Sequence, residues 1–200
     1  MHHYATDSNE RKLVPVLLAI VSILASWALY NALGVLQLAI PWWFDAPSVM
    51  GFYGLFYSIF DRRLWRIPII QKIGLVNLPN LNGNWEGYLL SSFDEHSTKY
   101  DARIEIIQSW TRISIILRTE NSESHSIIAT LTTENPGGII LSYAYLNEPK
   151  ANAKKTMHIH RGTAWLTLVK SGEMFEGEYY TGRDRQNYGS LHFERFQKKI

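Results

Sequence analysis

Cysteine is absent from the 200 residues of the chain, which excludes a disulfide framework and a thiolate metal site. The sequence also has no P-loop, no G-x-S-x-G and no G-x-G-x-x-G motif, so it gives no indication of a hydrolase or of a dinucleotide-dependent enzyme. A chain without disulfides fits a reducing compartment such as the cytosol. These absences favour a binding protein over an enzyme, and we expect no catalytic residues and no cofactor.

The second part of the chain also lacks the excess of positive charge that a nucleic-acid-binding domain would need. Positions 1–80 hold six Lys and Arg against four Asp and Glu, whereas positions 81–200 hold fourteen of each kind. A domain that grips DNA or RNA through its phosphates normally carries an excess of positive charge. We therefore expect no polymeric nucleic acid as a partner.

Charge is missing altogether from Leu13 to Ile40. About 20 apolar residues cross the hydrocarbon core of a bilayer, so this run predicts a transmembrane helix over about 13–40, with Pro15 in its first turn and Pro41 at its end. A second, weaker apolar segment over about 42–60 predicts a second span. A signal peptide is the alternative for the first segment, and a re-entrant or interfacial helix is the alternative for the second.

Basic residues flank this predicted hairpin at both ends, namely Arg11, Lys12, Arg62, Arg63 and Arg66. The connecting stretch "PWWFDA" carries no Lys or Arg, so the positive-inside rule places both flanks in the cytoplasm. We expect a cytosolic tail over 1–12, the two helices over 13–60, and a basic connector over 61–80 that lies along the membrane surface.

The remaining residues, 81–200, alternate between apolar and polar side chains in short runs that are separated by turn residues. This pattern is typical of antiparallel strands. Eight strands are predicted, at 84–93, 99–110, 112–119, 124–132, 138–146, 155–170, 173–181 and 188–196. Eight such strands can close into an up-and-down barrel whose interior holds one small ligand. The fold class is therefore all-β, as an eight-stranded antiparallel barrel preceded by a two-helix transmembrane hairpin.

Candidate ligand-binding residues concentrate near the end of the chain, in "GEYYTGRDRQNYGSLHFERF". Aromatic faces stack on bases, hydroxyls recognise polar edges, and guanidinium groups bind phosphates. This chemistry suits a small ring that contains phosphate, and the alternative is a solvated basic turn. The candidates are Tyr180, Thr181, Arg183 and Arg185, with Tyr143, Tyr145, His160 and Trp165 on earlier strands.

One spacing could suit a metal ion. His158 and His160 lie two residues apart and would share a strand face, as two ligands of one metal would. A third ligand would have to come from elsewhere in the fold, for example His125 or His192. Structural or surface histidines are the simpler interpretation, and we expect no metal.

The order of these features resembles a known family. Two apolar spans and a basic connector are followed by "LNGNWEG", "HIHRGTAWLTL" and "GEYYTGRDRQNYGSLHF", as in the two-transmembrane, β-strand-rich effectors of bacterial CBASS anti-phage operons. The resemblance implies an inner-membrane effector whose cytosolic barrel binds a cyclic dinucleotide made by a partner nucleotidyltransferase. It also implies that the protein assembles into a homo-oligomer and damages the inner membrane to abort phage infection.

Gly83 and Trp85 at the head of the first strand also resemble the opening of lipocalin-type barrels. In those barrels an Arg from the last strand packs on the Trp, and Arg195 is the matching candidate. These three residues are expected to close one end of the barrel and not to bind the ligand.

Two other functions remain open from the sequence. A membrane-tethered, lipocalin-like carrier would bind an apolar ligand in a uniformly apolar interior. A purely structural membrane anchor would have no pocket of a few hundred cubic ångströms. The polarity and volume of the barrel interior discriminate between these functions.

Overall fold

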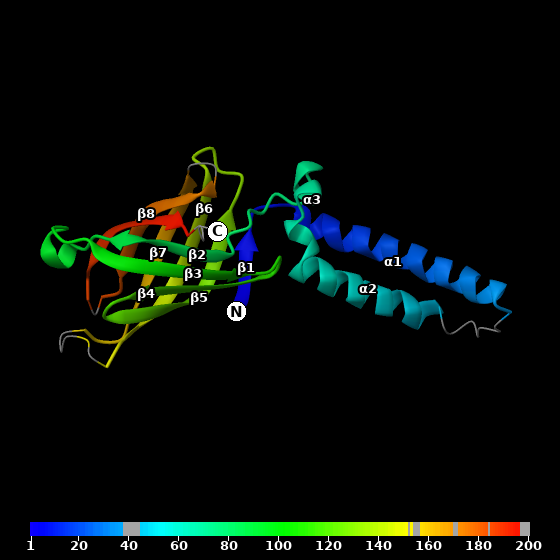
Figure 1. Cartoon of the computed structure of the whole chain (residues 1–200), viewed down its shortest axis with the longest axis horizontal. Helices are drawn as coiled ribbons and strands as arrows, with labels where there is room; N and C mark the ends of the chain where they lie inside the picture. Colours follow the sequence, from blue (N-terminus) through cyan, green and yellow to red (C-terminus); the bar gives the residue numbers. More distant parts are fainter. Residues whose placement is uncertain (38–44, 152, 154–156, 170–171, 184, 197–200) are drawn as a thin grey trace. The chain divides into compact units, whose positions relative to one another are not determined.

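The computed structural model describes residues 1–37, 45–151, 153, 157–169, 172–183 and 185–196 (Figure 1). The chain forms two compact units. One unit comprises Met1–Asp7 and Leu78–Ile200, and the other comprises Ser8–Asn77. The first unit is built of strands and the second of helices, so the chain leaves the strand-rich unit after seven residues and returns to it at Leu78.

The helices described in the second unit are α1 (Glu10–Val35), α2 (Asp45–Arg62), the short 3-10 helix η2 (Leu64–Arg66) and α3 (Pro68–Lys72). α1 and α2 run side by side (Figure 1), and the hydroxyls of Ser26 and Ser48 hydrogen-bond to each other between them. α1 begins at Glu10, before the predicted span, so Pro15 lies inside the helix and not in its first turn.

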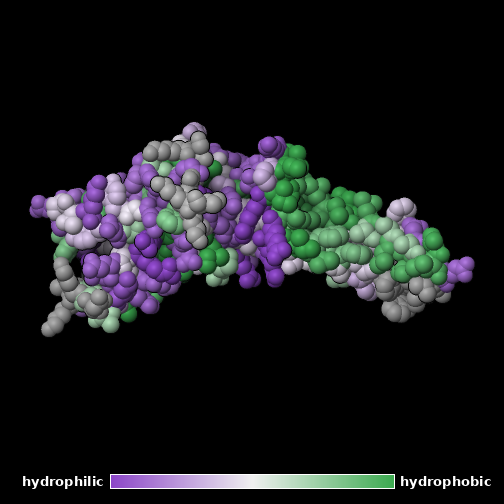
Figure 2. Space-filling model, in the orientation of Figure 1, coloured by the Kyte–Doolittle hydropathy of each residue, from purple (hydrophilic) through white to green (hydrophobic). Residues whose placement is uncertain are grey.

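The surface of α1 is hydrophobic along most of its length (Figure 2). Trp27, for example, is 66% exposed. Among the described residues α1 is the one helix that is long and apolar enough to cross a membrane. The predicted second segment begins at residues that lie outside the described ranges, and from Asp45 it is helical to Arg62.

Nine strands are described in the first unit: β1 (His2–Thr6), β2 (Gly83–Leu89), β3 (Tyr100–Gln108), β4 (Arg112–Thr119), β5 (Ser122–Thr132), β6 (Ile139–Pro149), β7 (His160–Val169), β8 (Met174–Thr181) and β9 (Tyr188–Arg195). A single 3-10 turn, η3 (Ser92–Asp94), follows β2. The strands are hydrogen-bonded in the ring order β1-β4-β3-β2-β9-β8-β7-β6-β5, which makes the sheet a closed barrel. Neighbouring strands are antiparallel, except that β1 runs parallel to β5.

The eight predicted strands correspond to β2–β9. Most of the observed strand ends differ from the predicted ends by a few residues. The predicted total of eight is wrong, because β1 adds a ninth strand from the segment that was expected to be a free tail over 1–12. A five-residue strand beside a polar terminus has no turn signal before it. Its partners lie more than a hundred residues away, so local sequence does not reveal it.

β1 is held firmly between β4 and β5. The Tyr4 side chain is only 5% exposed, and its hydroxyl donates to the Trp110 carbonyl at 3.0 Å. The Asp7 carboxylate accepts from the backbone N–H groups of Thr133 and Glu134, both at 2.9 Å. Burial would raise the pKa of Asp7, but these hydrogen bonds outweigh it and hold that pKa below its ordinary value.

The barrel interior near the start of β2 is filled by Trp85. This side chain is fully buried, and its indole Nε1 donates to the Leu81 carbonyl at 3.1 Å. The ring of Phe175 lies against it, with 4.3 Å between the centroids. Gly83 begins β2 with φ of +127°, a backbone conformation that other residues rarely adopt.

Arg195 at the end of β9 covers the other side of this indole. Its guanidinium carbon lies 4.3 Å from the centre of the Trp85 ring, a cation–π distance. The same guanidinium donates to the Asn82 carbonyl at 3.0 Å and to the Asn80 carbonyl at 2.9 Å. The predicted pairing of Trp85 with Arg195 is thus present. It connects β9 to the segment that leads into β2.

Trp85→Ala should destabilise the barrel by roughly 3 to 5 kcal/mol, because it removes a large buried side chain and leaves a cavity. Thermal melting of the full chain, followed in the β-sheet region of the circular dichroism spectrum, measures this. Trp165→Ala is the matched control, since Trp165 is 46% exposed. Equal losses of melting temperature in the two variants would contradict the closing role of Trp85.

Tyr4→Ala should also lower the melting temperature of the barrel, because it empties a buried site in β1 and breaks its hydrogen bond to Trp110. His3→Ala is the control, because His3 lies on the same strand with its side chain exposed. If both variants have the melting temperature of the wild type, β1 contributes nothing to barrel stability.

Candidate functional site

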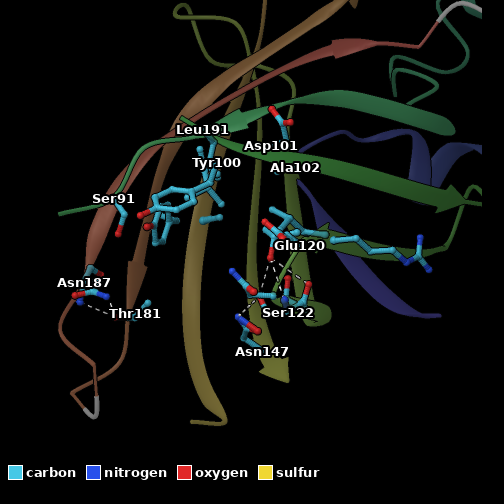
Figure 3. Close-up of a pocket in the computed structure, with 18 of the residues that line it drawn as sticks. Ser91, Tyr100, Asp101, Ala102, Glu120, Ser122, Asn147, Thr181, Asn187 and Leu191 are labelled. Atoms are coloured by element: carbon cyan, nitrogen blue, oxygen red, sulfur yellow. Dashed lines mark hydrogen bonds between the residues drawn. The ribbon is translucent and has the colours of Figure 1, made fainter. Parts of the chain in front are cut away.

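A cavity of about 1060 Å³ lies in the barrel unit, lined by residues of strands β2 to β9 and of the loops at their ends (Figure 3). Its volume is at the upper end of the range for small-molecule sites. Space arises because inward positions such as Ala102 and Ala164 carry small side chains. Gly87 is the direct cross-strand partner of Ala102, and a Cβ at Gly87 would collide with the backbone carbonyl of His192.

Five of the eight predicted ligand-binding residues line this cavity, namely Tyr143, Tyr145, His160, Thr181 and Arg185. They come from β6, β7, β8 and the turn after β8. The closed sheet brings these segments together although they are spread over more than forty residues of sequence. The cavity is therefore the place where the predicted chemistry converges.

Three of the predicted residues are not in the cavity. Trp165 and Tyr180 lie on the outer face of the barrel, where their rings meet edge to face with 5.6 Å between centroids. Alternation along a strand explains this, because their neighbours Ala164 and Tyr179 point inward. Arg183 is exposed and is not among the described residues that line the cavity.

The residues expected to close the barrel also lie away from the cavity. Among the described lining residues, Gly83, Trp85 and Arg195 do not appear. Trp85 instead packs on Phe175 in the apolar interior. Their placement fits the expected closing role, which the Trp85→Ala variant tests.

One wall of the cavity is aromatic. The rings of Tyr143 and Tyr145 lie 6.1 Å apart between centroids, and Tyr179 lines the same space. Burial raises the pKa of the Tyr143 and Tyr145 phenols far above the ordinary value of 10. Both phenols are therefore neutral donors at physiological pH. Gly162 faces Tyr145 across the strand pair, and any side chain at Gly162 would collide with the Tyr145 phenol.

A basic group comes from the turn between β8 and β9. The Arg185 guanidinium lies 5.9 Å from the Phe93 ring centre, and its Nη1 is buried without a hydrogen-bond partner among the described residues. With the Asn187 amide oriented to satisfy both groups, its side-chain oxygen accepts from Arg185 Nε at 2.9 Å. Asn187 is held in turn by Thr181, whose Oγ1 accepts from the Asn187 N–H at 2.7 Å. The turn thus holds the guanidinium through Nε and leaves Nη1 without a partner among the described residues.

A polar row lies on β5, β6 and β7. Ser122, Ser124 and His160 are buried polar residues, and Asn147 is the cross-strand partner of both Ser124 and His160. Figure 3 shows Ser122 and Asn147 on one side of the cavity, with Thr181 and Asn187 on the other. His160 Nδ1 lies 2.9 Å from the His158 carbonyl oxygen, so it carries the proton of that hydrogen bond.

The sequence analysis did not identify several of these residues. Ser122 comes directly after a stretch of turn residues, and Asn147 and Asn187 belong to types that are common in turns. Ser91 and Tyr100 flank the loop after β2. Strand alternation places Asn147 on the same face as Tyr145, and Tyr179 on the same face as Thr181. It does not say which face of each strand is the interior.

The metal hypothesis placed His158 and His160 on one strand face. β7 begins only at His160, so His158 lies outside the strand. In the part of the chain that the structure describes, no three His, Asp or Glu side chains are grouped as metal ligands.

Comparison with known proteins agrees with this architecture. The model of the Cap15 cyclic dinucleotide receptor domain matches residues 76–195, and the model of the Cap15 transmembrane helices matches residues 12–66. A CD-NTase-associated protein 15 from Yersinia aleksiciae is 30% identical over 156 residues, which cover 77% of this chain and 72% of the relative. One from Staphylococcus schleiferi is 30% identical over 143 residues, covering 71% and 75%. The chain therefore belongs to the Cap15 family of CBASS-associated, non-enzymatic effectors with a cyclic dinucleotide receptor domain.

Proposed function

We propose that the cavity of the barrel binds a cyclic dinucleotide and that Arg185 provides its phosphate contact. The observation that carries this proposal is the buried Nη1 of Arg185, which has no hydrogen-bond partner among the described residues and belongs to a residue that lines the cavity. A buried guanidinium nitrogen without an acceptor is energetically costly. A phosphate oxygen is the acceptor that a guanidinium binds best.

The rest of the cavity suits the other parts of such a ligand. Tyr143, Tyr145 and Tyr179 offer aromatic faces on which bases can stack. Neutral phenols and the hydroxyls of Ser122 and Thr181 can hydrogen-bond to ribose hydroxyls and base edges. The proposed site therefore keeps five of the residues predicted from sequence and leaves out Trp165, Tyr180 and Arg183.

The membrane part of the proposal rests on α1, α2 and their flanks. α1 has the length and apolar surface of a span, and the match to the Cap15 transmembrane helices extends through α2. Arg11 and Lys12 lie in the first turn of α1, Arg62 is the last residue of α2, and Arg63 follows it. We infer a two-span anchor in a bacterial inner membrane, with both ends and the barrel in the cytoplasm.

Assembly and membrane damage complete the proposed function. A ligand shifts an equilibrium toward the state that it binds better, so a cyclic dinucleotide from a cognate nucleotidyltransferase would drive self-association of the protein. The oligomer would gather apolar helices in the bilayer, disrupt the membrane and abort phage infection. The hydrogen bond between Ser26 and Ser48 is a polar contact between α1 and α2. When the helices associate in the oligomer, this hydrogen bond would have to be kept or exchanged for another.

The alternative function, a carrier of apolar ligands, fits the cavity less well. A carrier should have a uniformly apolar lining. This cavity is lined instead by Arg185, Asn147, Ser122 and Ser124 together with tyrosine hydroxyls. Its volume also disfavours a purely structural anchor.

Arg185→Gln should weaken cyclic dinucleotide binding by roughly tenfold or more, because a charge-assisted hydrogen bond contributes about 1.5 to 3 kcal/mol. Isothermal calorimetry on the full chain in detergent measures this. The full chain is needed because Met1–Asp7 belongs to the barrel unit. Arg183→Gln is the matched control, since it changes the same charge in the same turn outside the cavity. A flat wild-type response to all cyclic dinucleotides would refute the receptor proposal, and equal losses in both variants would refute the role of Arg185.

Replacing residues 13–60 by a flexible linker should abolish ligand-triggered leakage of dye from vesicles while keeping ligand binding. Residues 1–12 stay in this variant, so β1 can still join the barrel. Dye release from vesicles of bacterial lipid, before and after addition of the ligand, measures the effect. Undiminished leakage without the helices would contradict the proposed role of the membrane segments.

A further inference from the structure

Asn147 occupies a central position in the polar row of the cavity. It lies on β6, where its direct cross-strand partners are Ser124 on β5 and His160 on β7. Its side chain lines the cavity, on the side where Figure 3 shows Ser122. Three neighbouring strands therefore present polar groups side by side at this level of the barrel.

The amide of Asn147 is only half satisfied. Its Nδ2 donates to Ser122 Oγ at 3.2 Å, and Ser122 Oγ lies 3.1 Å from Thr119 Oγ1 in a second hydrogen bond. Its Oδ1 is buried and, within the described part of the chain, has no hydrogen-bond partner. Leaving a buried acceptor unsatisfied costs about 1 to 3 kcal/mol. Such a group in a native structure calls for an explanation, and a ligand in the cavity that Asn147 lines would supply one.

The free groups of this amide define what it can recognise. One proton of Nδ2 is used by Ser122, so Asn147 offers an acceptor, Oδ1, beside its second N–H donor. An amide that presents both groups pairs in bidentate fashion with a base edge that carries an N–H donor next to an acceptor. Adenine has such an edge in N6–H and N7, cytosine in N4–H and N3, uracil in N3–H and O4, and guanine in N1–H and O6.

We propose that Asn147 is a base-recognition residue that pairs with the edge of one base of the bound cyclic dinucleotide. This inference rests on the proposed receptor function and adds to it a residue that was not predicted from sequence. In this arrangement Arg185, beside Asn187, holds a phosphate, the tyrosines stack on a base, and Asn147 hydrogen-bonds to the edge of a base.

Two substitutions test this role. Asn147→Leu removes both hydrogen-bonding groups, so it should weaken the preferred ligand by roughly tenfold or more. It should leave the melting temperature unchanged or raise it, because the unsatisfied buried acceptor disappears. Asn147→Asp replaces the N–H donor by a second acceptor, so it should shift relative preference toward guanine, whose edge presents two adjacent N–H donors.

The experiment is a calorimetric titration of the full chain in detergent with cyclic dinucleotides that contain adenine, cytosine, guanine and uracil. Melting temperature is measured for each variant without ligand. Ser142→Ala is the control, because Ser142 is on β6 at the position between the inward-facing Leu141 and Tyr143 and should change neither affinity nor base preference.

Asn147→Leu with wild-type affinities and rank order would overturn the inference while leaving the receptor proposal intact. A drop in melting temperature that accompanies an equal loss for every ligand would also overturn it, because that is the result of a structural role. A wild-type protein that binds no cyclic dinucleotide would overturn both proposals. Changed base preference with unchanged stability is the expected result.

Discussion

Closure of the strand ladder is the constraint from which the other features of the barrel follow. Once β5 returns through β1 to β4, every strand has a partner on each side, and alternate residues are divided between a closed interior and the solvent. Trp85 and Phe175 fill part of that interior, and Arg195 fastens the last strand over the indole. A ligand that enters the barrel must therefore use the part of the interior that these side chains leave open.

The open part differs chemically from the filled part. Apolar side chains such as Ile104, Leu166 and Phe193 are fully buried, whereas the cavity contains tyrosines, serines, Asn147 and Arg185. Within the described part of the chain, two of these residues hold buried atoms without hydrogen-bond partners, which is unfavourable. The stability of the closed, apolar region can offset this cost, so the same fold supports a stable structure and a polar cavity.

The polypeptide links the two units twice, before Ser8 and after Asn77. β1 lies immediately before α1 in the sequence, and it is fixed in the barrel by Tyr4 and Asp7. β1 therefore connects the seam between β4 and β5 to α1 along the chain. The far ends of β4 and β5 also line the cavity, through Thr119 and Ser122, so the two strands that hold β1 belong to the cavity wall as well.

From the sequence alone the apolar helix, the eight strands β2–β9 and five of the residues that line the cavity could be predicted, because these depend on local periodicity and composition. The sequence could not determine β1, whose partners are distant in the chain. Nor could it separate Tyr179 from Tyr180 or Arg185 from Arg183, because neighbouring residues carry the same chemistry and only the closed sheet decides which of them faces inward. Asn147 shows the same limit: it is an ordinary polar residue in the sequence, and only tertiary packing buries its side-chain oxygen without a hydrogen-bond partner among the described residues.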